Sequence, residues 1–253
     1  MEKPILENIF VEQKEKEVFE SDLRVDFMRH GRAVYTEEEK ANLNFEGELT
    51  EAGIIQIENS ARELAGKINK DKEVIVIWST PKKRGRDTAD IVRRILKEEG
   101  ITVIENENKL EKKSLKDINF STDLEMPDWG NWMSYWAKNE EKIPEGTEKP
   151  ADIKKRIQRI LTYLERIAKQ VNPKENKKLH FICVTHEELF RDLLEEGFGY
   201  GTEKGTGPIN GEALTIDINK SENDKDAVFN MKFGDDKSSL SFDPKSRDFK
   251  KVK

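Results

Sequence analysis

The chain has 253 residues, and its 45 lysines and arginines against 51 aspartates and glutamates give a formal net charge of −6. This acidic balance argues against a protein that binds nucleic acid through general attraction to the phosphate backbone. Apolar residues make up only 35% of the sequence, but they gather into short runs such as VIVIW at 74–78. We therefore expect a folded core under a highly charged surface rather than a disordered chain.

The sequence shows no sign of export or of membrane insertion. No stretch approaches the roughly 18 apolar residues that a membrane span requires, and residues 1–20 lack the apolar centre of a signal peptide. Cys183 is the single cysteine and lies inside an apolar run, so no internal disulfide can form. These features predict a cytoplasmic protein in which Cys183 is a core residue.

Strands and helices alternate along the chain after a charged N-terminal arm at residues 1–23. The helices show apolar residues at three- and four-residue spacing, and the strands are short apolar runs between polar segments. In chain order, the expected elements are a strand at 24–28, a helix at 51–68, a strand at 73–78, a helix ending at Gly100, a strand at 101–105, a helix at 151–171, a strand at 179–184, a helix at 187–197 and a strand at 213–218. This alternation predicts an α/β fold, a three-layer α/β/α sandwich with a mixed, mainly parallel sheet and helices on both faces.

Two segments depart from this pattern. Residues 106–150 show no regular period and are interpreted as a cap inserted in the domain of residues 24–219. Residues 220–253 are interpreted as a charged appendage that forms a C-terminal hairpin. The cap contains an aromatic cluster, Trp129, Trp132, Tyr135 and Trp136. This cluster is either a lid over a substrate or one face of a short helix that covers the core.

Polar clusters follow three of the expected strands directly. Arg29 and His30 follow the strand at 24–28, and residues 79–86 follow the strand at 73–78. His186 follows the strand at 179–184. In open α/β sheets ligands bind beyond the carboxyl ends of the strands, so these clusters should meet in one crevice. Histidines and arginines together suit a phosphoryl group, because arginine forks match phosphate oxygens and imidazole can act as a nucleophile or a donor.

The same clusters carry a resemblance to a known family. The motifs are Arg29-His30-Gly31, LTEAG at 49–53, STPKKRGRDTA at 79–89, GTE at 146–148 leading to Arg156, and VTH at 184–186. In their order and spacing over residues 24–218, they resemble the histidine phosphatase superfamily, also called phosphoglycerate mutase-like. An R-H-G tripeptide alone is a weak signal, but five pieces in order form a specific one.

The resemblance implies a role for each matching residue. His30 would be the nucleophile that attacks phosphorus and becomes a phosphohistidine. Arg29 and Arg84 would hold the phosphate oxygens, and His186 would be the second histidine at the phosphate. No metal and no other cofactor is implied. The partner would be a phosphorylated small molecule or a phosphopeptide, with no nucleic acid and no membrane.

Two residues are candidates for the acid that protonates the leaving group. The family usually carries a glutamate two residues after a leucine that follows the third strand; counted from Leu110, this position holds Lys112, and Glu111 comes one step earlier. A one-residue shift of the loop would let Glu111 serve. The alternative is Glu187, directly after His186, because one branch of the superfamily places its acid there. Either carboxyl would need a raised pKa to hold a proton near neutral pH.

The expected activity is metal-independent hydrolysis of a phosphomonoester through a covalent phosphohistidine at His30. A phosphoglycerate mutase-type phosphotransferase is the first alternative, ranked lower because the acid-loop signature of the cofactor-dependent mutases is missing at 110–117. A non-catalytic phospholigand-binding module is the second, which Lys112 would allow but the retained histidines and arginines argue against. His180 has no motif partner, so we expect it to be structural.

Overall fold

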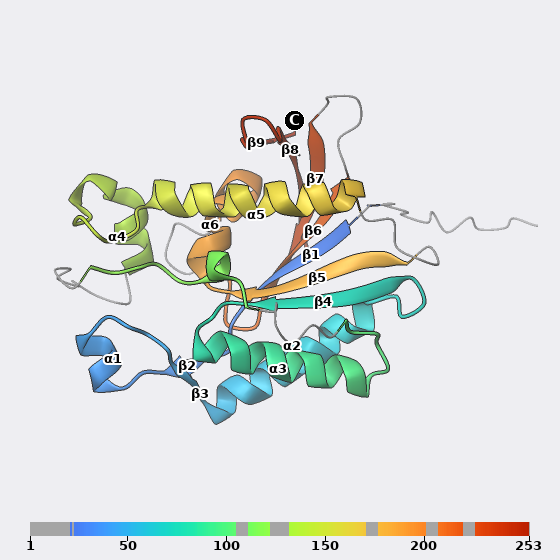
Figure 1. Ribbon diagram of the computed structural model, residues 1–253, viewed down its shortest axis with the longest axis horizontal. Helices are drawn as coiled ribbons and strands as arrows, with labels where there is room; N and C mark the ends of the chain where they lie inside the picture. Colours follow the sequence, from blue (N-terminus) through green and yellow to red (C-terminus); the bar gives the residue numbers. More distant parts are fainter. Residues whose placement is uncertain are drawn as a thin grey trace, which may run out of the picture.

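The computed structural model describes residue 21 and residues 23–104, 111–121, 132–170, 177–200, 207–219 and 226–252. Among these residues, a seven-stranded sheet lies between two layers of helices (Figure 1). The strand order is β4-β5-β1-β6-β7-β8-β9. The strands are β1 (Leu23–Arg29), β4 (Glu73–Ser79), β5 (Lys178–Thr185), β6 (Ala213–Asn219), β7 (Ala227–Phe233), β8 (Asp236–Phe242) and β9 (Phe249–Lys251).

The sheet has a parallel half and an antiparallel half. β5 pairs parallel with both β1 and β4. β6 pairs antiparallel with β1, and β7, β8 and β9 each pair antiparallel with the strand before them. Parallel neighbours need a long crossover, which helices provide here, whereas β6 to β8 follow one another through shorter connections. The predicted α/β sandwich with a mixed sheet is confirmed, and the parallel pairing is confined to the first half.

Helices cover both faces of the sheet. α2 (Glu51–Lys67) and α3 (Lys83–Glu98) lie on one face, and α5 (Pro150–Gln170) and α6 (Glu187–Phe198) lie on the other (Figure 1). Each layer encloses its own cluster of buried apolar side chains against the sheet. The cysteine at 183 is fully buried in the cluster below α5 and α6, as predicted. None of the described helices is long and apolar enough to cross a membrane.

Short elements complete the described chain. They are β2 (Ala33–Val34), α1 (Glu37–Ala41), β3 (Glu48–Leu49), the 3₁₀ turns η1 (Lys113–Leu115) and η2 (Glu140–Lys142), and α4 (Trp132–Lys138). β2 and β3 pair with each other in a separate two-stranded sheet. The strand predicted at 101–105 is not observed in residues 101–104, the part that the structure describes. A single bridge there joins Val103 to Ile75.

The C-terminal segment extends the main sheet instead of forming a separate appendage. β7 and β8 form the predicted hairpin, and β7 pairs with β6 along its length. Phe229, Leu240 and Phe242 are fully buried in the same core as α5 and α6. The hairpin is therefore part of the domain core. The predicted N-terminal arm lies outside the described residues except for Ser21 and Leu23.

The aromatic cluster of the cap is only partly described. Trp129 lies outside the described residues, and Trp132 begins α4. Trp136 is fully buried, and its Nε1 donates a hydrogen bond to the Glu148 carbonyl oxygen at 2.9 Å. For Trp136, the interpretation as a residue that covers the core is confirmed.

Close packing at the start of α2 holds the loop that follows β1. Thr50 is the N-cap residue, and its hydroxyl accepts a hydrogen bond from the Gly53 amide at 2.9 Å. A Cβ atom on Gly53 would lie 2.2 Å from the Arg32 carbonyl oxygen. Only glycine allows α2 to approach this backbone, which explains the glycine of the LTEAG motif.

Candidate active site

A cavity of about 450 Å³ opens beyond the carboxyl ends of β1 and β5. Among the described residues, its lining combines histidines, cationic side chains and carboxylates with an apolar wall. The charged and titratable lining residues are Arg29, His30, Lys40, Arg84, Asp117, His186, Glu187 and Glu188. The predicted convergence of the polar clusters is therefore observed for His30, His186, Arg29, Arg84 and Glu187.

His30 presents an unprotonated ring nitrogen to the cavity. The residue is buried, and its Nδ1 lies 2.8 Å from the Gly31 carbonyl oxygen. Because a carbonyl oxygen can only accept, Nδ1 carries the proton and Nε2 presents its lone pair. Nε2 accepts a hydrogen bond from Nε of Arg84 at 3.1 Å. Burial, together with the charges of Arg84 and Arg29, holds the pKa of His30 well below its ordinary value.

Arg84 connects both histidines through one buried guanidinium. It lies in the first turn of α3, and its Nη2 donates to Asp117 Oδ2 at 2.8 Å and contacts His186 Nδ1 at 3.0 Å. Its Nη1 donates to the carbonyl oxygens of Phe45 and Glu46. These contacts fix the plane of the guanidinium between the two imidazoles.

His186 is held in the opposite tautomer. Its Nδ1 must accept from Arg84, because a guanidinium nitrogen can only donate, so Nε2 carries the proton and donates to Thr80 Oγ1 at 3.0 Å. The rings of His30 and His186 lie 5.0 Å apart, with an interplanar angle of 63°. Burial and the nearby Arg84 hold the pKa of His186 well below its ordinary value. Both imidazoles are therefore neutral at physiological pH.

One buried nitrogen of Arg29 lacks a hydrogen-bond partner among the described residues. Its Nη1 donates to the Pro208 carbonyl oxygen at 2.7 Å and forms an ion pair with Glu187. Its Nε is buried and has no hydrogen-bond partner among the described residues. An unpaired buried N–H group is costly, and Arg29 lines the cavity.

The carboxylates predicted as proton donors occupy different places. Glu187 lines the cavity, and burial raises its pKa although the charge of Arg29 opposes the shift. Glu111 does not reach the cavity in this structure: its side chain is 55% exposed and lies 3.9 Å from Arg86. The physical reason is the bridge between Glu111 and Ser79, which fixes the register of this segment so that Glu111 points to solvent.

Two carboxylates that the sequence analysis missed also line the cavity. Asp117 is buried and ion-paired with Arg84. Glu188 is buried, and its Oε1 accepts a hydrogen bond from the Ile118 amide at 3.2 Å. Burial, together with the negative charges of Asp117 and Glu187, raises the pKa of Glu188 to about 7. The sequence signal for Glu188 was its place in the first turn of the helix that follows His186.

Arg156 supports this arrangement from outside the cavity. Its Nη1 and Nη2 donate to the carbonyl oxygens of Lys116 and Asp117 at 2.9 and 3.3 Å, and its side chain lies 3.3 Å from Glu148. The GTE segment and Arg156, which are far apart from Asp117 in the chain, thus hold the segment that contributes Asp117. No group of three or more histidine, cysteine or acidic side chains in the described part of the chain could hold a metal ion.

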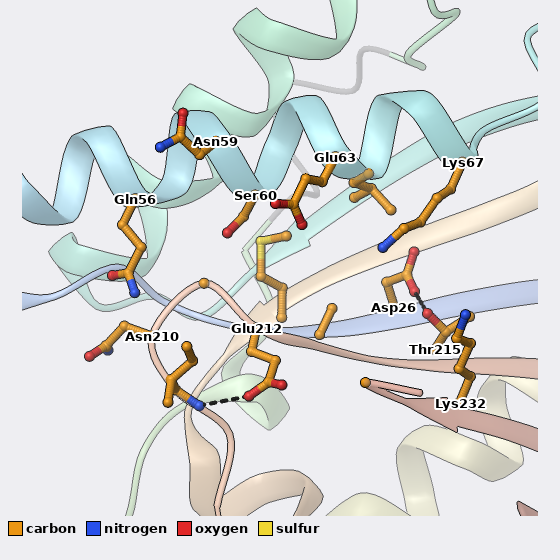
Figure 2. Close-up of a pocket in the computed structure, with 16 residues that line it drawn as sticks. Asp26, Gln56, Asn59, Ser60, Glu63, Lys67, Asn210, Glu212, Thr215 and Lys232 are labelled. Carbon is orange, nitrogen blue, oxygen red and sulfur yellow. Dashed lines mark hydrogen bonds between the residues drawn. The ribbon is translucent and has the colours of Figure 1, made fainter. Parts of the chain in front are cut away.

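A second cavity of about 420 Å³ lies between α2 and strands β6 and β7 (Figure 2). Asp26, Glu63 and Glu212 line it together with Lys67 and Lys232, and the amide side chains of Gln56, Asn59 and Asn210 lie toward one end. Its described lining holds no arginine and no histidine, so it lacks the donors that distinguish the first cavity.

Comparison with known proteins identifies the family of the chain. A family model described as the histidine phosphatase superfamily (branch 1) matches residues 25–223. A search of curated proteins found no significant match.

Three solved structures illustrate the likeness in fold. The first, described as mycobacterial hydrolase 1, is 17% identical, with 84% of this chain and 96% of that one aligned at a TM-score of 0.54. A mycobacterial glucosyl-3-phosphoglycerate phosphatase is 19% identical, covering 77% and 89% at 0.51. A phosphoglycerate mutase from Bacillus anthracis is 16% identical, covering 77% and 87% at 0.50. At these identities the likeness shows a common fold.

Proposed function

The chain belongs to branch 1 of the histidine phosphatase superfamily, and from this premise we propose that it hydrolyses phosphomonoesters through a covalent phosphohistidine at His30. The observation that carries the proposal is the pairing of two features in one cavity. His30 Nε2 is the unprotonated ring nitrogen, and its lone pair accepts a hydrogen bond from Arg84 Nε. The Nε–H of Arg29 has no partner among the described residues. A nucleophile beside an unsatisfied donor suits a phosphate whose oxygen fills the donor.

The first step transfers the phosphoryl group to the protein. A phosphate oxygen replaces His30 Nε2 as the acceptor of the Arg84 Nε–H, which frees the lone pair of His30 Nε2. Other phosphate oxygens accept from Arg29, and these contacts orient phosphorus for in-line attack by His30 Nε2. The new N–P bond forms as the bond from phosphorus to the ester oxygen breaks, and the electron pair leaves with that oxygen. His186, kept neutral and held by Thr80 and Arg84, lies beside the transferred group.

The second step returns the nucleophile. A water molecule attacks phosphorus, the N–P bond breaks, and inorganic phosphate leaves. The electron pair goes back to His30 Nε2, which is again the unprotonated nitrogen of the ring. The proton lost by the water passes to the carboxylate that protonated the leaving group, so the acid is restored.

We assign the acid to Glu188 and keep Glu187 as the alternative. Glu188 is buried in the cavity with a pKa raised to about 7, so it holds a proton near neutral pH. Glu187 is ion-paired with Arg29, which favours its charged form. Glu111 would have to move from its exposed position to take part.

Trapping the intermediate tests the proposal. The protein is mixed with an aryl phosphate in the presence of a chelator and quenched with base, and the site of phosphorylation is mapped by mass spectrometry. We expect one phosphoryl group on His30 in the wild type and none in His30→Ala. His180→Gln is the matched control, because it changes a buried histidine outside the cavity and should still become phosphorylated.

Three results would contradict the proposal. Turnover without any phosphohistidine would exclude the covalent route. Binding of phosphate or vanadate without turnover of any ester would instead favour the phospholigand-binding module. Phosphoryl transfer to a second substrate alcohol in preference to water would favour a phosphotransferase of the mutase type.

A further inference from the structure

One wall of the active-site cavity consists of three aromatic rings, of which the central one contacts the other two. The rings of Tyr35 and Phe45 lie 5.3 Å apart at 83°, and those of Phe45 and Phe120 lie 5.8 Å apart at 85°. Phe45 is buried, whereas Tyr35 and Phe120 are half-buried and keep part of their surface accessible. All three line the cavity. Edge-to-face rings of this kind offer an apolar surface on which another ring can pack.

The wall joins the phosphate site directly. The guanidinium carbon of Arg84 lies 5.5 Å from the centre of the Tyr35 ring, and the same guanidinium contacts both histidines. A phosphate held at Arg84 therefore places the rest of the ester within reach of Tyr35 and its neighbours. The part of the substrate that meets the wall is the leaving group.

The charges of the described lining disfavour a second anionic group on the substrate. Of the cationic side chains there, Arg84 is paired with Asp117 and Arg29 with Glu187. Both arginines are also the expected ligands of the phosphate. A further carboxylate on the leaving group would lie near Asp117 and Glu187, and like charges in a partly buried site repel.

Lys40 does not compensate for these carboxylates. Its ammonium group is 2.7 Å from Glu37 Oε1, and its side chain is about half exposed. An exposed lysine that already has a carboxylate partner adds little binding free energy for an anion. The described part of the cavity thus accommodates one dianionic phosphate and offers no built site for another anion.

We propose that the preferred substrates are phosphomonoesters whose leaving group contains a ring and carries no negative charge. This inference rests on the proposed phosphatase function and specifies its substrate class. The ring packs on Tyr35 and Phe120, and the absence of negative charge avoids the carboxylates. Phosphorylated sugar acids, which carry a carboxylate and lack an aromatic ring, are poor substrates on this view.

Four esters with alkoxide leaving groups test the inference, since they separate recognition from chemical activation. Benzyl phosphate and ethyl phosphate differ by the ring. Benzyl phosphate and its 4-carboxy derivative differ by the charge, and 3-phosphoglycerate lacks the ring and has the charge. We expect kcat/KM for benzyl phosphate to exceed that for each of the other three by about 10-fold or more, the usual discrimination by apolar contacts.

One substitution tests whether the aromatic wall causes the preference for a substrate with a ring. Phe120→Ala should lower kcat/KM for benzyl phosphate about 10-fold more than it lowers kcat/KM for ethyl phosphate, because only the ring packs on the wall. Tyr163→Ala is the matched control, since Tyr163 is an exposed aromatic residue on α5 that is not in the cavity lining. It should alter neither rate.

The outcomes separate this inference from the proposed function. Equal rates for benzyl and ethyl phosphate, or a preference for 3-phosphoglycerate that Lys40→Ala removes, would overturn the inference and leave the phosphatase function intact. An equal loss for both esters in Phe120→Ala would also overturn it, because the residue would then be only structural. If no ester is hydrolysed and no phosphohistidine forms, the proposed function fails and the inference fails with it.

Discussion

The three histidines of this chain are all buried, but they lie in two regions where the nearest charged side chains differ in sign. His30 and His186 share the cavity with Arg84, and burial and its charge keep them neutral. His180 lies inside the sheet, where its Nε2 is 2.5 Å from Asp26 and its Nδ1 is 2.8 Å from Glu73. Burial would lower its pKa, but the two carboxylates outweigh burial and raise it. The neighbours, and not the extent of burial, decide whether the pKa of a buried imidazole is lowered or raised.

The charged cluster in the sheet, the triad of Asp26, His180 and Glu73, joins three adjacent strands. Asp26 belongs to β1, His180 to β5 and Glu73 to β4. The Thr215 hydroxyl on β6 donates to the second carboxylate oxygen of Asp26. Every ring nitrogen of His180 is thus occupied by a carboxylate, which leaves no lone pair for chemistry. This supports the expected structural role.

The largest expected effect on activity comes from removing the proposed nucleophile. His30→Ala should lower kcat/KM for benzyl phosphate by at least about 10⁴-fold, because the covalent route is lost. The melting temperature should stay close to that of the wild type. Steady-state kinetics and a thermal melt check both points. A loss of turnover of the same size in His180→Gln, measured per folded molecule, would show that the two regions do not have separate roles.

Two substitutions in the cavity test which carboxyl group is the proton donor. Glu188→Gln should lower kcat for benzyl phosphate by about 10²- to 10⁴-fold and barely affect an aryl phosphate, whose leaving group needs little protonation. The wild-type kcat/KM should fall as pH rises through about 7, where Glu188 loses its proton, and the variant should lack this limb. Glu187→Gln is the matched control. Selectivity for the alkyl ester in that control, and not in Glu188→Gln, would move the role to Glu187.

Removing the cation from the triad should cost stability. His180→Gln is expected to lower the free energy of unfolding by about 3–5 kcal/mol, because it leaves two buried carboxylates without their partner. Urea denaturation at neutral pH measures the change. A loss below about 1 kcal/mol would mean that the triad is not a charged unit.

The pH dependence of stability should differ in sign between the regions. The folded-state pKa of His180 is raised, so its stabilising effect is complete below about pH 6.5 and is lost as pH rises through the folded pKa. His30 and His186 have lowered pKa values; the unfolded chain binds their protons first, and stability falls below about pH 6.5.

The contribution of His180 to this pH dependence can be measured with one variant. The gap in unfolding free energy between wild type and His180→Gln should stay level below about pH 6.5 and then narrow by about 1.4 kcal/mol per pH unit until the folded pKa is reached. Urea denaturation over a range of pH values provides the gap. A gap that widens at alkaline pH would mean that His180 is neutral in the native protein.

The fold and the meeting of the two cavity histidines follow from local patterns in the sequence. His30 and His186 each come directly after an apolar strand, and parallel strands bring their carboxyl ends to one edge. For this reason, the place of both residues could be predicted without knowing any side-chain contact. The triad around His180 could not, because its partners lie on neighbouring strands whose register emerges only in the folded sheet.

The acid was harder to predict, since it depends on geometry finer than the element pattern. A single bridge between Glu111 and Ser79 decides that Glu111 points to solvent, and a shift of one residue would reverse it. Glu188 follows Glu187 by one residue, yet this step turns the side chain far enough around α6 to bury it. Asp117 comes from a segment without a period, and Arg156 holds its backbone in place.

The buried thiol of Cys183 on β5 can report how often the folded protein opens. Cys183 lies midway between His180 and His186, is fully inaccessible, and has a pKa raised by burial. A thiol-specific reagent in solution can modify it only during excursions that separate the helices from the sheet. The rate of alkylation under native conditions therefore follows the population of such open states, with no label introduced and no denaturant present.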